Sequence, residues 1–257
     1  MAKKKIGFIQ SRGLGDIVIA LPIARYYYEQ DCEVLWPIAQ EFVPSVSRAV
    51  PWIKWIPLAV DGNAYFYETP MERLRNFKCD EVICLYQSLS SHPEMTKRPE
   101  FQITGFDQIK YHIAGVPFKR KWTLDQCITR DPQREAALKT QVGIVGDEPY
   151  VVVHLEGSDY STTIDPSWIP EGWKVIEVKP TTNCIFDWLG VLEGAQSIIA
   201  VDSVIANLVD QLGIADNVDS YFLPRSHIHL TPVLGCAWIV LDPNPETLKR
   251  ITIFKSG

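Results

Sequence analysis

A turn with two glycines and a carboxylate lies near the start of the chain, where a strand pattern changes to a helix pattern. Apolar residues at 6–9 precede the turn, and an apolar helical pattern at 17–29 follows it. Glycines let a backbone turn tightly and approach a ligand, and a helix dipole favours a carboxylate in the first turn. Asp16 is therefore either a helix-capping residue or a general base that the turn presents to a ligand. The turn consists of Ser11, Arg12, Gly13, Leu14, Gly15 and Asp16.

Polar residues follow four strand patterns in the second half of the chain, where a phosphorylated ligand could bind. Backbone N–H groups at a helix start bind phosphate together with hydroxyls, and basic side chains offset its charge. A carboxylate repels phosphate, so Asp202 and Glu156 are better suited to holding sugar or ribose hydroxyls. Each candidate also has an ordinary explanation as a cap or a surface turn. The candidates, besides Arg12, are Glu156, Ser158, Thr162, Thr163, Lys179, Asp202, Ser203 and Arg225.

The sequence predicts neither a metal ion nor a bound cofactor. His227 and His229 are spaced as a metal-binding pair, but no acidic or cysteine residue stands where it would complete the site. His154 falls inside an apolar strand pattern, which is typical of a buried histidine that finds a hydrogen-bonding partner in the core.

Length, charge and cysteine content restrict the class of protein. The chain has 257 residues, enough for one large domain or two smaller ones. Its net charge of −6 gives no overall basic field that would attract nucleic acid or anionic lipid. Six scattered cysteines without a CxxC pair are typical of reduced thiols, and no apolar run approaches a membrane span. We therefore expect a cytoplasmic protein without a membrane span.

Strand patterns alternate with helix patterns along the chain, which predicts an α/β fold with parallel, doubly wound sheets. The charged segment 119–147 is the best linker candidate, because a new strand pattern begins after it. We expect two domains, residues 1–125 and 126–257. The predicted strands cover 6–9, 32–36, 53–57, 80–85, 150–155, 173–178, 197–201 and 238–241; the predicted helices cover 17–29, 40–48, 71–76, 103–115, 134–142, 187–196 and a segment ending at 212.

Three segments resemble motifs of the heptosyltransferase-like glycosyltransferases, glycosyltransferase family nine. Residues 11–22 are similar to the family's N-terminal Leu/Met-Gly-Asp turn with its following apolar helix. Residues 162–173 resemble its Thr-Thr…Trp-Pro-Glu-x-Trp segment. Residues 195–213 look like its strand–Asp–Thr/Ser–helix element, with Asn207 where the family usually has histidine. The three segments occur in the family's order and bracket most of the chain.

The resemblance implies a GT-B fold, in which two Rossmann-like domains face each other. Residues 1–125 would bind the acceptor, and residues 126–257 would bind a nucleotide-sugar donor as co-substrate. The implied reaction is a metal-independent, inverting transfer of the sugar to a hydroxyl of a saccharide or a similar acceptor, with Asp16 as the base and Asn207 among the donor contacts. The chain is shorter than usual for the family and has Val204 in place of a glycine. These departures leave the identity of the donor open.

Three alternatives stay open. The same chemistry could act on a hydroxymethylated base in DNA, although the acidic net charge disfavours DNA. The basic residues that could line a groove for DNA are Arg73, Arg75 and those at 97–98 and 119–121. A dinucleotide-dependent oxidoreductase would use the turn at 13–15, which lacks the third glycine of the usual fingerprint. A non-catalytic nucleotide-sugar binding protein would not need Asp16 for its function.

Overall fold

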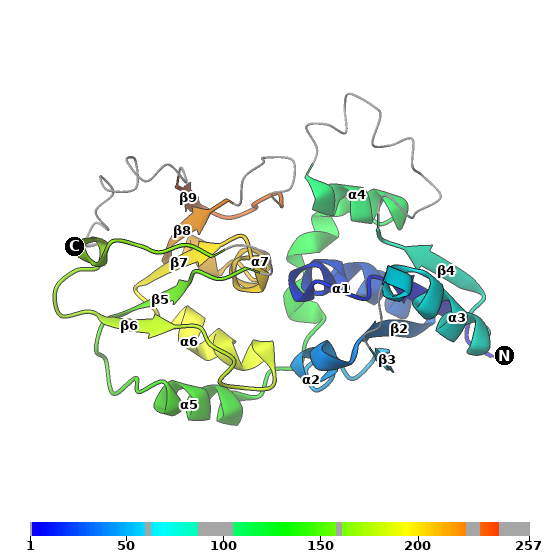
Figure 1. Ribbon diagram of the computed structural model, residues 1–257, viewed down its shortest axis with the longest axis horizontal. Helices are drawn as coiled ribbons and strands as arrows, with labels where there is room; N and C mark the ends of the chain where they lie inside the picture. Colours follow the sequence, from blue (N-terminus) through cyan, green and yellow to red (C-terminus); the bar gives the residue numbers. More distant parts are fainter. Residues whose placement is uncertain (1, 60–62, 87–104, 158–160, 225–231, 242–257) are drawn as a thin grey trace. The chain divides into compact units, whose positions relative to one another are not determined.

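The chain divides into two compact units (Figure 1). Unit 1 comprises Met1–Arg130 with Cys184–Phe186, and unit 2 comprises Asp131–Asn183 with Asp187–Gly257. The computed structural model describes residues 2–59, 63–86, 105–157, 161–224 and 232–241. The predicted ligand contacts Ser158 and Arg225, together with His227 and His229, lie outside the described residues.

Unit 1 contains a four-stranded parallel sheet in the order β3-β2-β1-β4. Its strands are β1 (Lys5–Ile9), β2 (Glu33–Ala39), β3 (Lys54–Leu58) and β4 (Glu81–Cys84). Strands β1 and β2 are buried from their second residue onward. Such continuous burial is expected of central strands in a sheet that is covered on both faces.

Helix α3 (Glu68–Asn76) covers one face of this sheet. Its Leu74 packs with Ile9 of β1 in one apolar cluster. Gly7 makes this approach possible, because a Cβ atom at residue 7 would lie 2.8 Å from Cδ1 of Leu74. A larger residue at position 7 would push α3 away from the strand that leads to the predicted turn.

Helix α1 (Leu14–Glu29) covers the opposite face. Tyr27 of α1 contacts Phe8 with a ring-centroid distance of 5.8 Å, and successive strand residues point to opposite faces. Residues 17–24 of α1 are all buried, because the helix lies between β2 on one side and α4 and η6 on the other. The other helices of unit 1 are η1 (Gln40–Phe42), α2 (Val43–Val46), η2 (Asn63–Phe66), α4 (Phe106–Ile113), η6 (Phe118–Trp122) and η7 (Leu124–Gln126).

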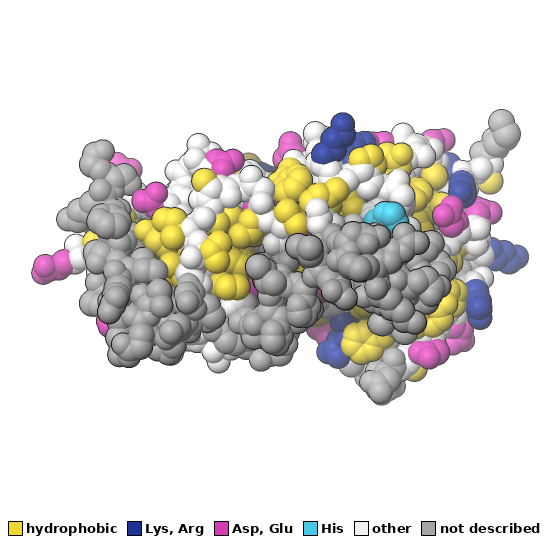
Figure 2. Space-filling view, turned by 90° about the horizontal axis from the view of Figure 1, so that it is seen from above, with side chains coloured by type: hydrophobic (Ala, Val, Ile, Leu, Met, Phe, Trp, Pro, Cys, Tyr) yellow, Lys and Arg dark blue, Asp and Glu magenta, His cyan; other side chains and the backbone are white. Residues whose placement is uncertain are grey.

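The basic run at 119–121 does not form an exposed patch. Lys121 is fully buried, and its Nζ lies 2.8 Å from Oδ2 of the equally buried Asp107. Arg120 binds the carboxylate of Glu29. On the face that Figure 2 shows, the described Lys and Arg side chains stand in small separate groups, several of them close to acidic side chains. The charges of this run therefore hold unit 1 together more than they offer a basic groove.

Unit 2 contains a five-stranded parallel sheet in the order β6-β5-β7-β8-β9. Its strands are β5 (Tyr150–His154), β6 (Lys174–Glu177), β7 (Ser197–Val201), β8 (Asp219–Leu223) and β9 (Trp238–Val240). Its helical segments are α5 (Pro132–Gln141), η8 (Pro166–Trp168), η9 (Ile185–Trp188), α6 (Leu189–Glu193), α7 (Val204–Gln211) and η10 (Ile214–Asp216).

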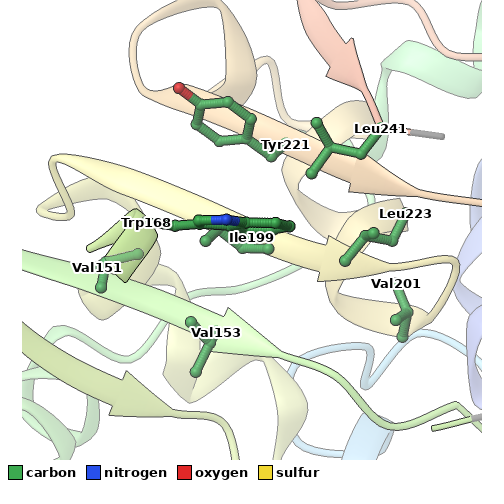
Figure 3. Packing of buried hydrophobic residues seen from close by; sticks show 8 residues of the cluster. All are labelled: Val151, Val153, Trp168, Ile199, Val201, Tyr221, Leu223 and Leu241. Atoms are coloured by element: carbon green, nitrogen blue, oxygen red, sulfur yellow. The ribbon is translucent and has the colours of Figure 1, made fainter. Parts of the chain in front are cut away.

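One face of the unit 2 sheet is covered by Trp168 of the short helix η8. The indole ring lies across the side chains that β5, β7 and β8 direct to this face (Figure 3). These residues alternate along each strand, as a pleated sheet requires. They are Val151, Val153, Ile199, Val201, Tyr221 and Leu223, with Leu241 beyond β9. The connection between β5 and β6 thus fills this face with one large ring.

A buried carboxylate attaches β9 to the unit 2 sheet. Oδ1 of Asp210, at the end of α7, accepts hydrogen bonds from the backbone N–H groups of Gly235 and Cys236, at 2.8 and 3.2 Å. It also accepts one from the indole N–H of Trp238, at 3.1 Å. These bonds fix the segment that enters the fifth strand.

The order of strands reverses beside the first strand of each unit. Strand β1 lies between β2 and β4, and strand β5 lies between β6 and β7. Open α/β sheets bind ligands outside the carboxyl ends of their strands at such a reversal. The residues that follow the paired strands there are 10–16 and 85–86 in unit 1, and 155–156 and 202–203 in unit 2.

The predicted α/β fold with parallel sheets is confirmed, and each predicted strand range matches an observed strand to within a few residues, whereas strand β8 lies outside the predicted ranges. Two predicted helices are shorter than expected. The helix predicted at 40–48 is a 3-10 turn followed by four α-helical residues, and the helix predicted at 187–196 is η9 followed by α6. Among the described residues, no helix combines the length and apolar character needed to cross a membrane.

Replacing Trp168 with alanine should destabilise the protein by about 3–5 kcal/mol, because the substitution leaves a cavity in the cluster of Figure 3. Urea unfolding followed by circular dichroism measures the loss. Val145→Ala is the control, since Val145 is 70% exposed and its truncation should cost little. A loss below about 1 kcal/mol for Trp168→Ala would contradict this packing.

Candidate functional site

The turn after β1 places the carboxylate of Asp16 directly over Gly13. Gly13 has a φ of 78°, and its carbonyl accepts the first hydrogen bond of α1 from the N–H of Ile17, at 2.9 Å. A Cβ atom at residue 13 would collide with Oδ2 of Asp16. Glycine is therefore required at position 13 for two reasons, the left-handed backbone and the close carboxylate.

Asp16 forms an ion pair with Lys110 of α4, which the sequence analysis missed. Nζ of Lys110 lies 3.1 Å from Oδ1 of Asp16. It also donates to Oε1 of Gln10 at 2.7 Å and to the carbonyl of Leu85 at 3.5 Å. The side chain of Lys110 is only 7% exposed, whereas that of Asp16 is 34% exposed. The ion pair is thus anchored in the protein on the lysine side and accessible on the carboxylate side.

Three acceptors match the three donors of an ammonium group, so the position of Lys110 is well determined. The ammonium also lies over the rings of Tyr86 and Phe106, 5.9 and 5.6 Å from their centroids. The sequence did offer a signal, because Lys110 stands beside Ile109 and Tyr111 in a helix whose neighbouring positions are buried. A cation at such a position needs acidic or carbonyl partners.

The hydroxyl of Ser11 stabilises the turn after β1 through hydrogen bonds. It donates to the carbonyl of Tyr65 at 2.8 Å and lies 3.3 Å from the hydroxyl of Tyr86. The Tyr86 hydroxyl in turn accepts the backbone N–H of Arg12 at 2.9 Å. Burial raises the pKa of Tyr86, so this hydroxyl stays protonated. Ser11 thus holds the loop in shape, and Gly15 forms part of the half-buried first turn of α1.

Arg12 is the exposed member of the turn. Its guanidinium lies 5.3 Å from the ring centroid of Tyr65 and 4.0 Å from Oε1 of Glu41. Nearly half of its side chain is accessible. The structure therefore places one accessible cation on the same turn as Asp16.

At the corresponding edge of unit 2, His154 contacts Ser203. Nδ1 of His154, the last residue of β5, lies 2.8 Å from Oγ of Ser203, which precedes α7. Burial lowers the pKa of His154 from 6.5 to about 4. The imidazole is therefore neutral at neutral pH. The expected hydrogen bond is present, but His154 is half-buried, and its partner is the predicted ligand contact Ser203.

Asn207 and Asp202 support the backbone around Ser203. The side-chain amide of Asn207 donates to the carbonyl of Ser203 at 2.9 Å, and the carbonyl of Asn207 accepts from the side chain of Gln211 at 3.2 Å. Asp202 is nearly buried, and its N–H donates to the carbonyl of Leu223 at 3.0 Å. The structure brings these residues together with His154 at the carboxyl ends of β5 and β7.

The remaining described candidates lie on exposed segments beside β5 and β6. Glu156 forms an isolated β-bridge with Ser161, and the N–H of Thr162 donates to the carbonyl of Leu155 at 3.0 Å. The hydroxyl of Thr162 lies 3.5 Å from the carbonyl of Thr163. Lys179 pairs with Glu177 at 2.7 Å, and hydrogen bonding to this carboxylate raises the pKa of the lysine. Lys179 is thus accessible but already has an acidic partner.

The described residues contain no group of three or more His, Cys, Asp or Glu side chains arranged to hold a metal ion.

Two doubly wound α/β units, each with polar groups at its reversal of strand order, define a GT-B-like fold.

Solved structures with this fold are named as glycosyltransferases. A glycosyl transferase family 9 protein from Veillonella parvula DSM 2008 matches 98% of this chain and 91% of its own, with a TM-score of 0.59 and 13% identity. ADP-heptose lps heptosyltransferase II from E. coli matches 97% and 95%, with a TM-score of 0.51 and 12% identity. The iron-containing dodecameric glycosyltransferase TibC from enterotoxigenic E. coli H10407 matches 95% of this chain and 65% of its own, with a TM-score of 0.52 and 13% identity; a second TibC structure is a complex with ADP-D-beta-D-heptose.

No protein-family model matches the chain, and no curated protein does. At 12–13% identity the similarity concerns the fold. The predicted GT-B fold, and the resemblance to heptosyltransferase-like glycosyltransferases at the level of the fold, are confirmed.

The lowered pKa of His154 makes the stability of the protein depend on pH. Between pH 6.5 and about 4 the unfolded chain binds a proton at this residue that the folded chain does not bind. The free energy of unfolding therefore falls as the pH falls through this window, by at most about 3 kcal/mol. Urea unfolding at pH 7, 5.5 and 4 measures the change in the wild type and in His154→Asn.

His154→Asn has no imidazole that could take up this proton in the unfolded chain. Its free energy of unfolding should therefore fall less than that of the wild type as the pH falls. His112→Asn, which replaces an exposed histidine, should follow the wild type. Equal pH dependence of wild type and His154→Asn would show that His154 is not a buried neutral imidazole.

Proposed function

We propose that this protein is a glycosyltransferase that moves a sugar from a nucleotide-diphosphate sugar to an acceptor hydroxyl. The observation that carries the proposal is the Asp16–Lys110 ion pair at the carboxyl end of β1. It provides a fixed, accessible carboxylate at the ligand-binding edge of a fold that solved glycosyltransferases share.

In the proposed reaction Asp16 acts as the general base. The acceptor hydroxyl oxygen attacks the anomeric carbon, and its proton passes to the Asp16 carboxylate. The bond from the anomeric carbon to the phosphate oxygen breaks, and the nucleoside diphosphate leaves with the electron pair. Attack opposite the leaving group inverts the anomeric configuration, and charge on the leaving group is held by hydrogen-bond donors and cations.

Lys110 and Gly13 orient the base. Lys110 binds Oδ1 of Asp16, and Oδ2 lies over Gly13, so we assign Oδ2 as the oxygen that receives the proton. Arg12, exposed on the same turn, supplies a cation for an anionic group of either substrate. The proposed chemistry requires neither a metal ion nor a bound cofactor.

The donor is proposed to bind at the carboxyl ends of β5 and β7 in unit 2. Ser203 and the first N–H groups of α7 would contact the diphosphate, with hydroxyls of Thr162 and Thr163 adding donors. Asp202 and Glu156 are assigned to sugar or ribose hydroxyls. Lys179 could bind the diphosphate only if it released its ion pair with Glu177.

A saccharide hydroxyl is the proposed acceptor. A hydroxymethylated DNA base is less well supported, because Lys121 is buried against Asp107 and Arg120 binds Glu29. DNA binding depends on accessible basic side chains. The six free thiols favour work in the reducing environment of the cytoplasm.

Asp16→Asn should lower kcat by a factor of about 10² or more while the protein stays folded, because the amide cannot accept the proton. Turnover is measured as release of nucleoside diphosphate from the donor. Asp31→Asn is the control, since the Asp31 side chain is 79% exposed. Unchanged turnover in Asp16→Asn would exclude Asp16 as the base. If neither the wild type nor Asp16→Asn turns over the donor and both bind it equally well, the protein is a nucleotide-sugar binding protein.

A panel of nucleoside diphosphates, nucleotide sugars, NAD and NADP should separate the transferase from an oxidoreductase. One nucleoside diphosphate and its sugar conjugates should raise the melting temperature, with about 2.7 kcal/mol of added stability at 100 times Kd. Stabilisation by NAD or NADP alone would contradict the proposal.

A further inference from the structure

Ser203 stands at the start of α7 but its side chain does not cap this helix. A serine at this position usually accepts an N–H of the first helical turn with its hydroxyl oxygen. Here the backbone of Ser203 is extended, with φ −157° and ψ 179°, and its side chain makes no capping hydrogen bond. The hydroxyl lies instead 2.8 Å from Nδ1 of His154.

The backbone of Ser203 is held independently of this contact. Its carbonyl accepts both the backbone N–H of Asn207, at 3.1 Å, and the side-chain amide of Asn207, at 2.9 Å. His154 is fixed by the pairing of β5 with β7, in which it stands opposite Ala200. The hydrogen bond between His154 and Ser203 therefore joins two positions that the backbone already fixes, and it determines where the Ser203 hydroxyl points.

The protonation of His154 decides what Ser203 can offer a ligand. A neutral imidazole carries one N–H, and burial keeps His154 neutral by lowering its pKa to about 4. If Nδ1 carries the proton, it donates to Oγ of Ser203, and the hydroxyl hydrogen remains available for a phosphate oxygen. If Nε2 carries it, Ser203 donates to Nδ1 and turns only lone pairs to the ligand.

We infer that His154 is a positioning residue that donates from Nδ1 to Ser203 and thereby turns the Ser203 hydroxyl into a hydrogen-bond donor for the diphosphate of the nucleotide sugar. The inference rests on the proposed function. It specifies that His154 of unit 2 acts on the nucleotide sugar through the side chain of Ser203. His154 need not touch the ligand itself.

The test measures the affinity for a nucleoside diphosphate in a double-mutant cycle. The probe is whichever of ADP, UDP, GDP and dTDP binds the wild type most tightly by calorimetry. His154→Leu and Ser203→Ala should each weaken binding by about tenfold or more, the size expected for one lost hydrogen bond to a charged group. The double variant should be no weaker than either single variant, because both remove the same interaction.

Two further variants separate positioning from a structural role. His154→Asn keeps an N–H near the position of Nδ1 and should restore most of the affinity. Ser197→Ala removes a buried hydroxyl bond from the other end of β7, to the carbonyl of Asp219, and should leave the affinity unchanged. In steady-state kinetics His154→Leu should raise KM for the donor and leave KM for the acceptor unchanged.

The tautomer of His154 provides a test on the wild-type protein that does not depend on variants folding. Proton–nitrogen correlation spectra of the imidazole should show a protonated Nδ1 and an unprotonated Nε2. The opposite tautomer overturns the inference, as do additive losses in the double variant or an unchanged affinity in His154→Leu. If the wild type binds none of the four diphosphates, the proposed function fails and the inference fails with it. Binding without coupling overturns the inference alone.

Discussion

Parallel strands must send each connection across one face of their sheet. Where neighbouring strands send theirs to opposite faces, the carboxyl ends between them are left open to a ligand. This happens beside β1 and beside β5, and the turn with Asp16 and the segment with Ser203 lie at these two places. Apolar packing behind these edges, with Leu74 over Gly7 and Trp168 over the unit 2 sheet, covers one face of each sheet.

Unit 1 contains two lysine–carboxylate ion pairs that differ in the burial of the carboxylate. Lys121 and Asp107 are both fully buried, and breaking such a pair would leave an uncompensated charge in the core. Lys110 is nearly as buried, but its partner Asp16 is one-third exposed. The first pair holds α4 to η6. The second pair fixes one oxygen of a carboxylate that stays partly accessible, as a base for an incoming substrate requires.

The sequence was sufficient to predict the α/β class, most strands and the turn that carries Asp16, because these follow from local patterns. It was not sufficient to predict that Lys110 would pair with Asp16, since this contact joins residues far apart in the chain. His154 could be predicted to be buried from its apolar neighbours, but its contact with Ser203 depends on the pairing of β5 with β7. Lys179 was correctly placed after a strand. Its pairing with Glu177 could not be predicted, because Lys179 lies beyond the end of β6, where strand alternation no longer sets the direction of a side chain.

The central claim is that Asp16 takes a proton from an acceptor that displaces the diphosphate in a single step. One displacement at the anomeric carbon inverts its configuration, whereas a mechanism through a covalent sugar–enzyme intermediate retains it. The most direct measurement is therefore the anomeric configuration of the freshly formed product, read from proton NMR coupling constants. The account predicts the opposite configuration to that of the donor, and a product with the donor's configuration would contradict it.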